Sequence, residues 1–203
     1  MESFANSKNI LLWIKTTVFI LALIPLSRLI IAAIDDRLGA NPIEKITHTT
    51  GYWALTFLLL TLSATPLRAL SKWFWPIRIR RMLGLFAFFY ACLHFLSYLV
   101  LDQFFDWPAI IEDIEKRPYI TIGFTAFLLL VPLAITSNNA IARKIGGKNW
   151  RRLHKLIYPI AIAGVIHFLW LVKKDLSQPI TFALLLASLL LLRWFFQQTN
   201  SKP

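Results

Sequence analysis

The chain has 203 residues, of which 57% are hydrophobic and 14% aromatic, and it carries a formal net charge of +12 at pH 7. This composition is too apolar for a soluble domain of this size and is typical of a protein that crosses a membrane several times. The single cysteine, Cys92, excludes an intramolecular disulfide and a cysteine-ligated iron–sulfur cluster.

Six apolar runs predict six transmembrane helices in an all-α polytopic bundle. Each run has about 17–25 residues, the length that a helix needs to cross a hydrocarbon core of about 30 Å. No series of ten-residue alternating segments indicates a β-barrel. The first run is too long for a removable signal peptide and lacks a small-residue cleavage site, so we expect it to be retained. The expected helices cover residues 10–34, 47–64, 82–101, 119–136, 153–172 and 180–196, within one domain at 1–203.

The loops between these runs differ sharply in charge. Residues 65–81 and 137–155 contain eleven lysines and arginines and no acid, whereas nine of the ten acids lie in the other loops. The positive-inside rule therefore predicts that the two basic loops and both termini are cytoplasmic, and that the acidic loops face the periplasm or the exterior. This distribution explains the net charge without nucleic acid, and the basic face also suits anionic lipid head groups or a cofactor phosphate.

No segment is typical of a nucleotide-binding domain. A glycine-rich dinucleotide fingerprint following a strand is missing, and Gly146-Gly147 in a basic loop indicates only a turn. The sequence also shows no internal repeat. We therefore expect a membrane bundle without its own NAD(P)H domain.

The four histidines, His48, His94, His154 and His167, all lie inside or at the edge of apolar runs. An imidazole is costly in hydrocarbon and usually has a function there. At a rise of 1.5 Å per residue, His94 lies roughly 18 Å and His167 roughly 21 Å from the cytoplasmic start of its helix. Two helices that run in the same direction thus present imidazoles at one level, which predicts that His94 and His167 ligate one haem.

His154 and His48 leave more than one interpretation open. His154 precedes His167 by thirteen residues, which separates them by about 19.5 Å along the helix and about 140° around it. Arg81 holds the corresponding position before His94; it stays protonated and can pair with a haem propionate but cannot bind iron. His154 is therefore either a ligand of a second haem or an interfacial residue near a quinone or flavin. His48 is either an interface residue or a contact to a propionate or a partner protein.

Other classes of function are weighed against this one. Membrane histidines also serve as simple interhelical hydrogen-bonding groups. A transporter or channel is disfavoured because the apolar runs lack buried acids and paired glycine-broken helices. A ferric reductase that uses NAD(P)H would need a separate flavoprotein.

Several separated stretches resemble the MsrQ (YedZ) family of bacterial haem-binding membrane subunits, and together they cover nearly the whole chain in order. These stretches are residues 39–44, 78–85, 92–98, 117–123, 150–158 and 167–170.

The resemblance implies membership of the ferric-reductase-like transmembrane superfamily, with b-type haem and an association with FMN. It implies that His94, His154 and His167 are the haem ligands. From their charge and position we also expect a flavin phosphate or haem propionates to be held by Arg78, Arg80, Arg81, Arg151 and Arg152, with His48 as a further cofactor contact. The resemblance also implies a non-catalytic electron-transfer subunit that draws on the quinone pool, or on a cytoplasmic flavin reductase. Its partner in a heterodimer would be a periplasmic molybdopterin subunit, MsrP, that reduces methionine sulfoxide in oxidised proteins. Superfamily members with two haems usually have two histidines at the positions where this chain has Arg81 and His94. The number of haems, one or two, therefore stays open at this point.

Overall fold

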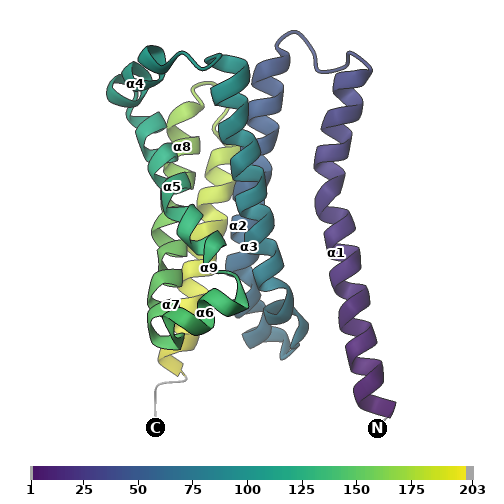
Figure 1. Ribbon diagram of the computed structural model, residues 1–203. Helices are drawn as coiled ribbons and strands as arrows, with labels where there is room; N and C mark the ends of the chain where they lie inside the picture. Colours follow the sequence, from purple (N-terminus) through teal and green to yellow (C-terminus); the bar gives the residue numbers. More distant parts are fainter. Residues whose placement is uncertain (1, 200–203) are drawn as a thin grey trace.

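The computed structural model describes residues 2–199 as an all-α bundle (Figure 1). Within this part of the chain, six helices are long and apolar enough to cross a membrane, which confirms the predicted fold class. The helical segments are α1 (Glu2–Ile34), α2 (Pro42–Ser71), α3 (Trp75–Leu96), a π-helical turn (Ser97–Asp102), α4 (Trp107–Lys116), α5 (Pro118–Ile135), α6 (Asn139–Ile145), α7 (Gly147–Leu153), a 3-10 turn (His154–Leu156), α8 (Ile157–Leu171) and α9 (Ser177–Thr199).

The helix ends follow local sequence signals. Asn41 caps α2, because its side-chain oxygen accepts a hydrogen bond from the Glu44 backbone N–H at 3.2 Å, and Pro42 occupies the first turn, where its missing N–H costs nothing. At the other end Lys72 adopts a left-handed conformation with φ of 59°. The helix therefore extends beyond the expected 47–64 in both directions.

The α3 and α8 spans each contain an irregular turn. After Leu96 the α3 span continues as the π-helical turn, a feature that often lies at functional sites. The α8 span begins with α7 and passes through the 3-10 turn before Ile157. Pro159 supplies no N–H to the turn before it, which explains this change of helix type.

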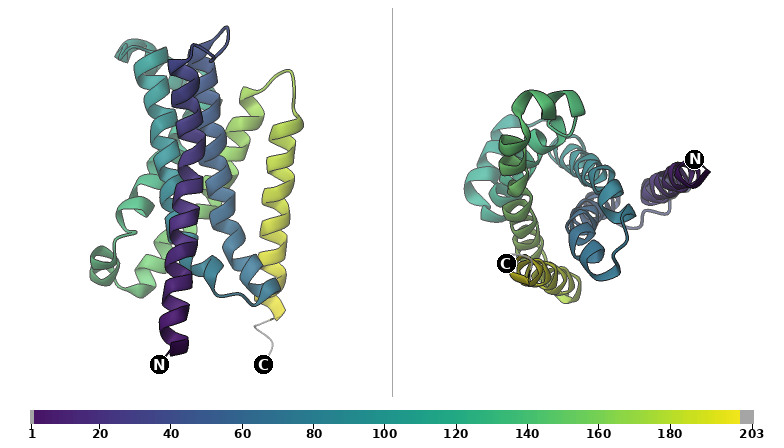
Figure 2. Two further views of the ribbon diagram at one scale, coloured as in Figure 1. Left: turned by 90° about the vertical axis from the view of Figure 1, so that its right-hand side faces the viewer. Right: turned by 90° about the horizontal axis from the view of Figure 1, so that it is seen from below.

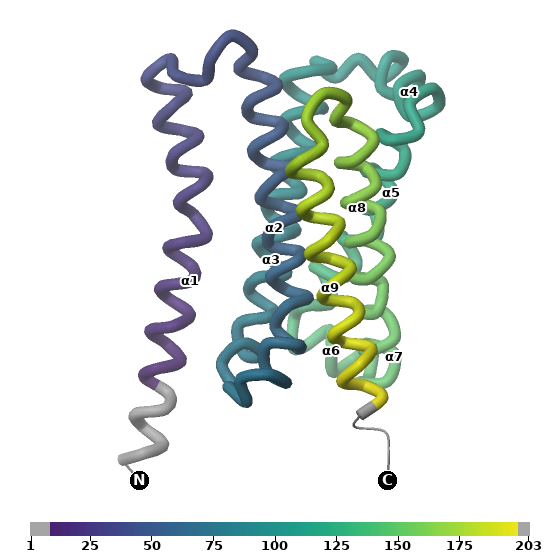
Figure 3. Tube along the Cα trace, turned by 180° about the vertical axis from the view of Figure 1, so that it is seen from behind, coloured from purple at the N-terminus to yellow at the C-terminus, as the bar shows by residue number. Residues whose placement is uncertain are grey.

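Five spans pack together, and α1 lies to one side of them (Figures 1 and 3). The view from below in Figure 2 shows α1 at the edge of the bundle, where it contacts α2 and α3, and α9 lies against α2 and α8. The core between α2 and α3 is aromatic: Phe57 stacks on Tyr90 at 5.4 Å and lies 5.5 Å from Phe86. Large apolar side chains on the outside, such as Trp13 at 71% exposure, fit a surface covered by lipid.

The two ends of the bundle have different loops. One end carries α4 and the connections from α1 to α2 and from α8 to α9, and is called the α4 end. The other carries α6, α7 and the connection from α2 to α3, and is called the α6–α7 end. Helix α1 begins and α9 ends at the α6–α7 end (Figure 1).

Tyr90 provides a specific contact between α1 and the bundle. Its hydroxyl donates a hydrogen bond of 2.7 Å to the Ala22 carbonyl, and its side chain is only 1% exposed. We expect Tyr90→Phe to lower the free energy of unfolding by about 1 kcal/mol, because a buried acceptor loses its donor. Thermal unfolding in detergent measures the change. Tyr52→Phe is the control, since Tyr52 is partly exposed, and equal stability of the two variants would contradict the assignment.

Candidate functional site

His94 lies in the last turn of α3, beside the first turns of α2. Its Nδ1 is 2.9 Å from the Thr47 carbonyl oxygen, and the Thr47 hydroxyl lies 2.9 Å from the Ser97 hydroxyl. A carbonyl only accepts hydrogen bonds, so Nδ1 donates its hydrogen and Nε2 keeps its lone pair. This is the tautomer in which Nε2 is available to bind a metal.

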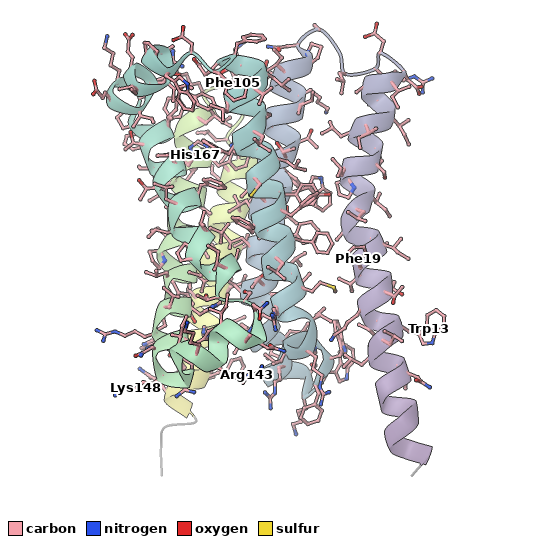
Figure 4. All side chains as sticks on the ribbon, in the orientation of Figure 1. Trp13, Phe19, Phe105, Arg143, Lys148 and His167 are labelled. Carbon is pink, nitrogen blue, oxygen red and sulfur yellow. The ribbon has the colours of Figure 1, made fainter. Side chains whose placement is uncertain are left out.

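His167 has the same environment on the other side of the bundle. It lies near the end of α8, and its Nδ1 is 2.7 Å from the carbonyl oxygen of Tyr119 on α5. The same argument leaves its Nε2 free as a ligand. Figure 4 shows His167 at the level of the upper turns of the bundle, toward the α4 end.

Each imidazole also lies directly against a glycine of the neighbouring helix. An ideal Cβ on Gly51 would be 3.0 Å from Nδ1 of His94, and one on Gly123 would be 2.7 Å from Nδ1 of His167. Each glycine follows its carbonyl residue by one helical turn, Gly51 after Thr47 and Gly123 after Tyr119. Only glycine lets the rings pack this close to the backbone.

The two histidine environments are therefore built alike. In each, one helix provides a carbonyl and, four residues later, a glycine, and a second helix provides the histidine. The carbonyl precedes the histidine by 47 residues in α2–α3 and by 48 residues in α5–α8. This similarity in structure is not visible as a sequence repeat.

The two rings lie at a distance suited to one iron. Their centroids are 6.1 Å apart and their planes are inclined by 75°. Two metal–nitrogen bonds of about 2.0 Å, with about 1.1 Å from each nitrogen to its ring centre, give a spacing of roughly 6.2 Å. Within the described residues, no third His, Cys, Asp or Glu completes a metal-binding cluster. The donors therefore fit a haem, whose porphyrin supplies the other ligands.

His154 lies far from this pair, at the α6–α7 end, and its nitrogens are used differently. Its Nε2 is 3.0 Å from the Thr136 hydroxyl, and its ring stacks on Trp150 at 4.0 Å. The Trp150 indole N–H donates to the Thr136 carbonyl at 2.9 Å, which ties α7 to the end of α5. The ring is thus held by a hydroxyl and an indole instead of a glycine and a backbone carbonyl.

A cavity of about 610 Å³ opens beside His154 between α2, α3, α5, α8 and α9. Of the predicted cofactor-binding arginines, Arg80, Arg81 and Arg151 line it, whereas Arg78 and Arg152 are exposed and do not. Arg81 also donates a hydrogen bond of 2.5 Å to the Asn139 side chain on α6. His48 is exposed on α2, one residue after Thr47 and therefore at the other end of the bundle.

A hydrogen-bonded acid holds α4 against the His94 end of α3. The buried Asp113 carboxylate accepts hydrogen bonds from Tyr98 at 3.1 Å and Gln103 at 3.2 Å, and pairs with Arg117 at 3.1 Å. Its negative charge raises the pKa of the Arg117 guanidinium above the ordinary value. The cluster fixes the loop that follows the π-helical turn.

Sequence reasoning missed the residues that hold the histidines: Thr47, Gly51, Tyr119 and Gly123. The only signal was that Gly51 and Gly123 are two of the four glycines inside expected transmembrane helices, where glycine usually marks close packing. It also missed Arg193, which lines the cavity from α9.

Two neighbouring imidazoles among the six candidate membrane spans of the described residues are typical of the class of membrane proteins that hold a prosthetic group. The family model described as "Ferric reductase like transmembrane component" matches residues 50–165, which include His94, Gly51 and Gly123 and end two residues before His167. The chain belongs to this family and, within it, to the MsrQ proteins.

The similar proteins include curated relatives named as the haem-binding subunit MsrQ of a protein-methionine-sulfoxide reductase. The relative from Herminiimonas arsenicoxydans is 54% identical over 100% of this chain and 94% of its own length. That from Rhodospirillum rubrum is 54% identical over 88% of this chain and 86% of its own. That from Ralstonia nicotianae is 47% identical over 89% and 84%, respectively.

Proposed function

We propose that this protein is the membrane electron-transfer subunit of a methionine sulfoxide reductase system, with one b-type haem held by His94 and His167. The observation that carries the proposal is the 6.1 Å spacing of two imidazoles whose Nδ1 atoms are both bonded to backbone carbonyls. The names of the relatives support the same function.

The chain's own residues prepare this site before any cofactor binds. The Thr47 and Tyr119 carbonyls fix the tautomers, and Gly51 and Gly123 let each ring lie flush against the next helix. Haem bound in this way supplies a one-electron carrier whose iron has no open position, which suits electron transfer better than oxygen chemistry. The apolar walls of the bundle exclude water from the site.

The charge distribution supports a direction across the bacterial inner membrane. The eleven cations on residues 65–81 and 137–155 support a cytoplasmic α6–α7 end, with both termini on the same side. The cavity beside His154 at that end would hold FMN, and the quinone pool would supply the electrons. The same cavity is the second place where a haem would fit. The acidic α4 end faces the periplasm and docks the molybdopterin subunit that repairs oxidised proteins, forming a heterodimer.

Purified protein tests this function when it is mixed with a quinol, the periplasmic subunit and methionine sulfoxide. We expect a haem spectrum that is reduced by the quinol and reoxidised only when subunit and substrate are both present. A colourless protein would contradict the proposal and favour a transporter. Reduction by NADPH with a flavoprotein, but never by quinol, would instead favour a ferric-reductase-type donor.

A further inference from the structure

The cavity at the α6–α7 end is lined by positive charge without a matching acid. Five cationic residues contribute to its wall, and none of the lining residues is an aspartate or glutamate. The remaining wall is apolar and aromatic. The five cations are Arg80, Arg81, Arg151, Lys155 and Arg193.

Two of these cations, Arg80 and Arg193, are partly buried and repel each other electrostatically. The Nε atom of Arg193 is buried without a hydrogen-bond partner, and its guanidinium lies 5.0 Å from the Tyr158 ring centre. Arg80 makes one long hydrogen bond of 3.5 Å, to Thr65, and its charge is repelled by Arg193. Partly buried guanidinium groups without an acid are costly, which indicates that an anion is part of this site.

We propose that Arg80 and Arg193 form a clamp for an oxyanion, either a phosphate monoester or a carboxylate, carried by a planar cofactor in the cavity. Guanidinium groups bind both kinds of anion with paired, charge-assisted hydrogen bonds. Trp150, Tyr158 and Leu130 supply flat and apolar walls for the ring system. The volume of about 610 Å³ lies within the range of cofactor pockets.

Arg193 is not among the cofactor contacts expected from the sequence, and it singles out Arg80 from the other expected cations as its partner in the clamp. Arg81 already bonds to Asn139, and Arg78 lies outside the cavity. Arg193 belongs to α9, which follows the segment matched by the family model. The proposal deepens the proposed function, because it assigns the anionic end of the cofactor through which electrons enter.

The test uses FMN and riboflavin, which differ only in the phosphate, with purified protein and flavin fluorescence as the readout. We expect FMN to bind at least about tenfold more tightly than riboflavin. Arg193→Gln and Arg80→Gln should remove this difference, and Arg193→Lys, which keeps the charge, should restore part of it. Arg143→Gln, an exposed cation of α6, is the matched control.

A pyridine haemochrome assay on the same proteins distinguishes a carboxylate source. If a haem occupies the cavity, the wild type should hold two haems and the Arg193→Gln variant one, with the haem of His94 and His167 retained. Equal binding of FMN and riboflavin together with an unchanged haem count would overturn the clamp. The clamp would be overturned as well if a phospholipid were the only molecule that the wild type holds and the variants lose. A wild-type protein that contains no haem at His94 and His167 would count against the proposed function. In that case the comparison of FMN with riboflavin would still test the clamp.

Discussion

Replacing either His94 or His167 by glycine is expected to reduce bound haem by about tenfold or more, because under the proposed function each imidazole would hold the iron. The structure offers no substitute, since no other His, Cys, Asp or Glu joins the pair within the described residues. Haem per protein, measured as the pyridine haemochrome, gives the result. His48→Gly is the control, because His48 is exposed on α2.

Added imidazole separates loss of a ligand from loss of the fold. The glycine variants leave a space of the right shape, so free imidazole should restore the haem spectrum while the protein remains folded. A His94→Gly variant that keeps its full haem without imidazole would contradict the ligand assignment. Stable protein that imidazole fails to rescue would likewise count against it.

Gly123→Ala is expected to weaken haem binding by about 10–100-fold, the range measured when residues that orient a metal ligand are changed. The added Cβ would lie 2.7 Å from Nδ1 of His167, which is too close, so the ring must leave the Tyr119 carbonyl. Gly51→Ala should have a smaller effect, since its Cβ would lie 3.0 Å from His94. A haem titration of the purified variants measures both.

Gly84→Ala is the matched control for these glycine changes. Its Cβ would meet the Thr61 side chain at 3.6 Å, an ordinary contact at the α6–α7 end, so binding of the haem at His94 and His167 should stay at the wild-type level. A Gly123→Ala protein with unchanged haem affinity and spectrum would show that the close packing of the ring has no role in binding.

The six spans and the common level of His94 and His167 could be predicted from the sequence, because both follow from helix length and the rise per residue. The contacts that orient the two histidine rings could not be predicted from the sequence. Thr47 and Gly51 face His94 only because of the rotation of α2 against α3, and helix rotation depends on packing between spans. A single glycine within an apolar run does not reveal which ring it contacts.

The α6–α7 end was harder to predict for related reasons. The 3-10 turn at His154–Leu156 interrupts the ideal helix on which the 140° angle between His154 and His167 was based. The hydrogen bond to Thr136 depends on α5, which is distant in sequence. Arg193 was indistinguishable from an ordinary cation at a membrane interface until the fold placed it beside Tyr158.

The central claim is that one iron is bound by Nε2 of both His94 and His167, and electron paramagnetic resonance of the oxidised protein tests it most directly. The account predicts a low-spin ferric signal typical of two imidazole ligands, converted to a high-spin signal when either histidine is replaced by glycine. A high-spin signal in the wild type, or a low-spin signal that survives both replacements, would contradict it.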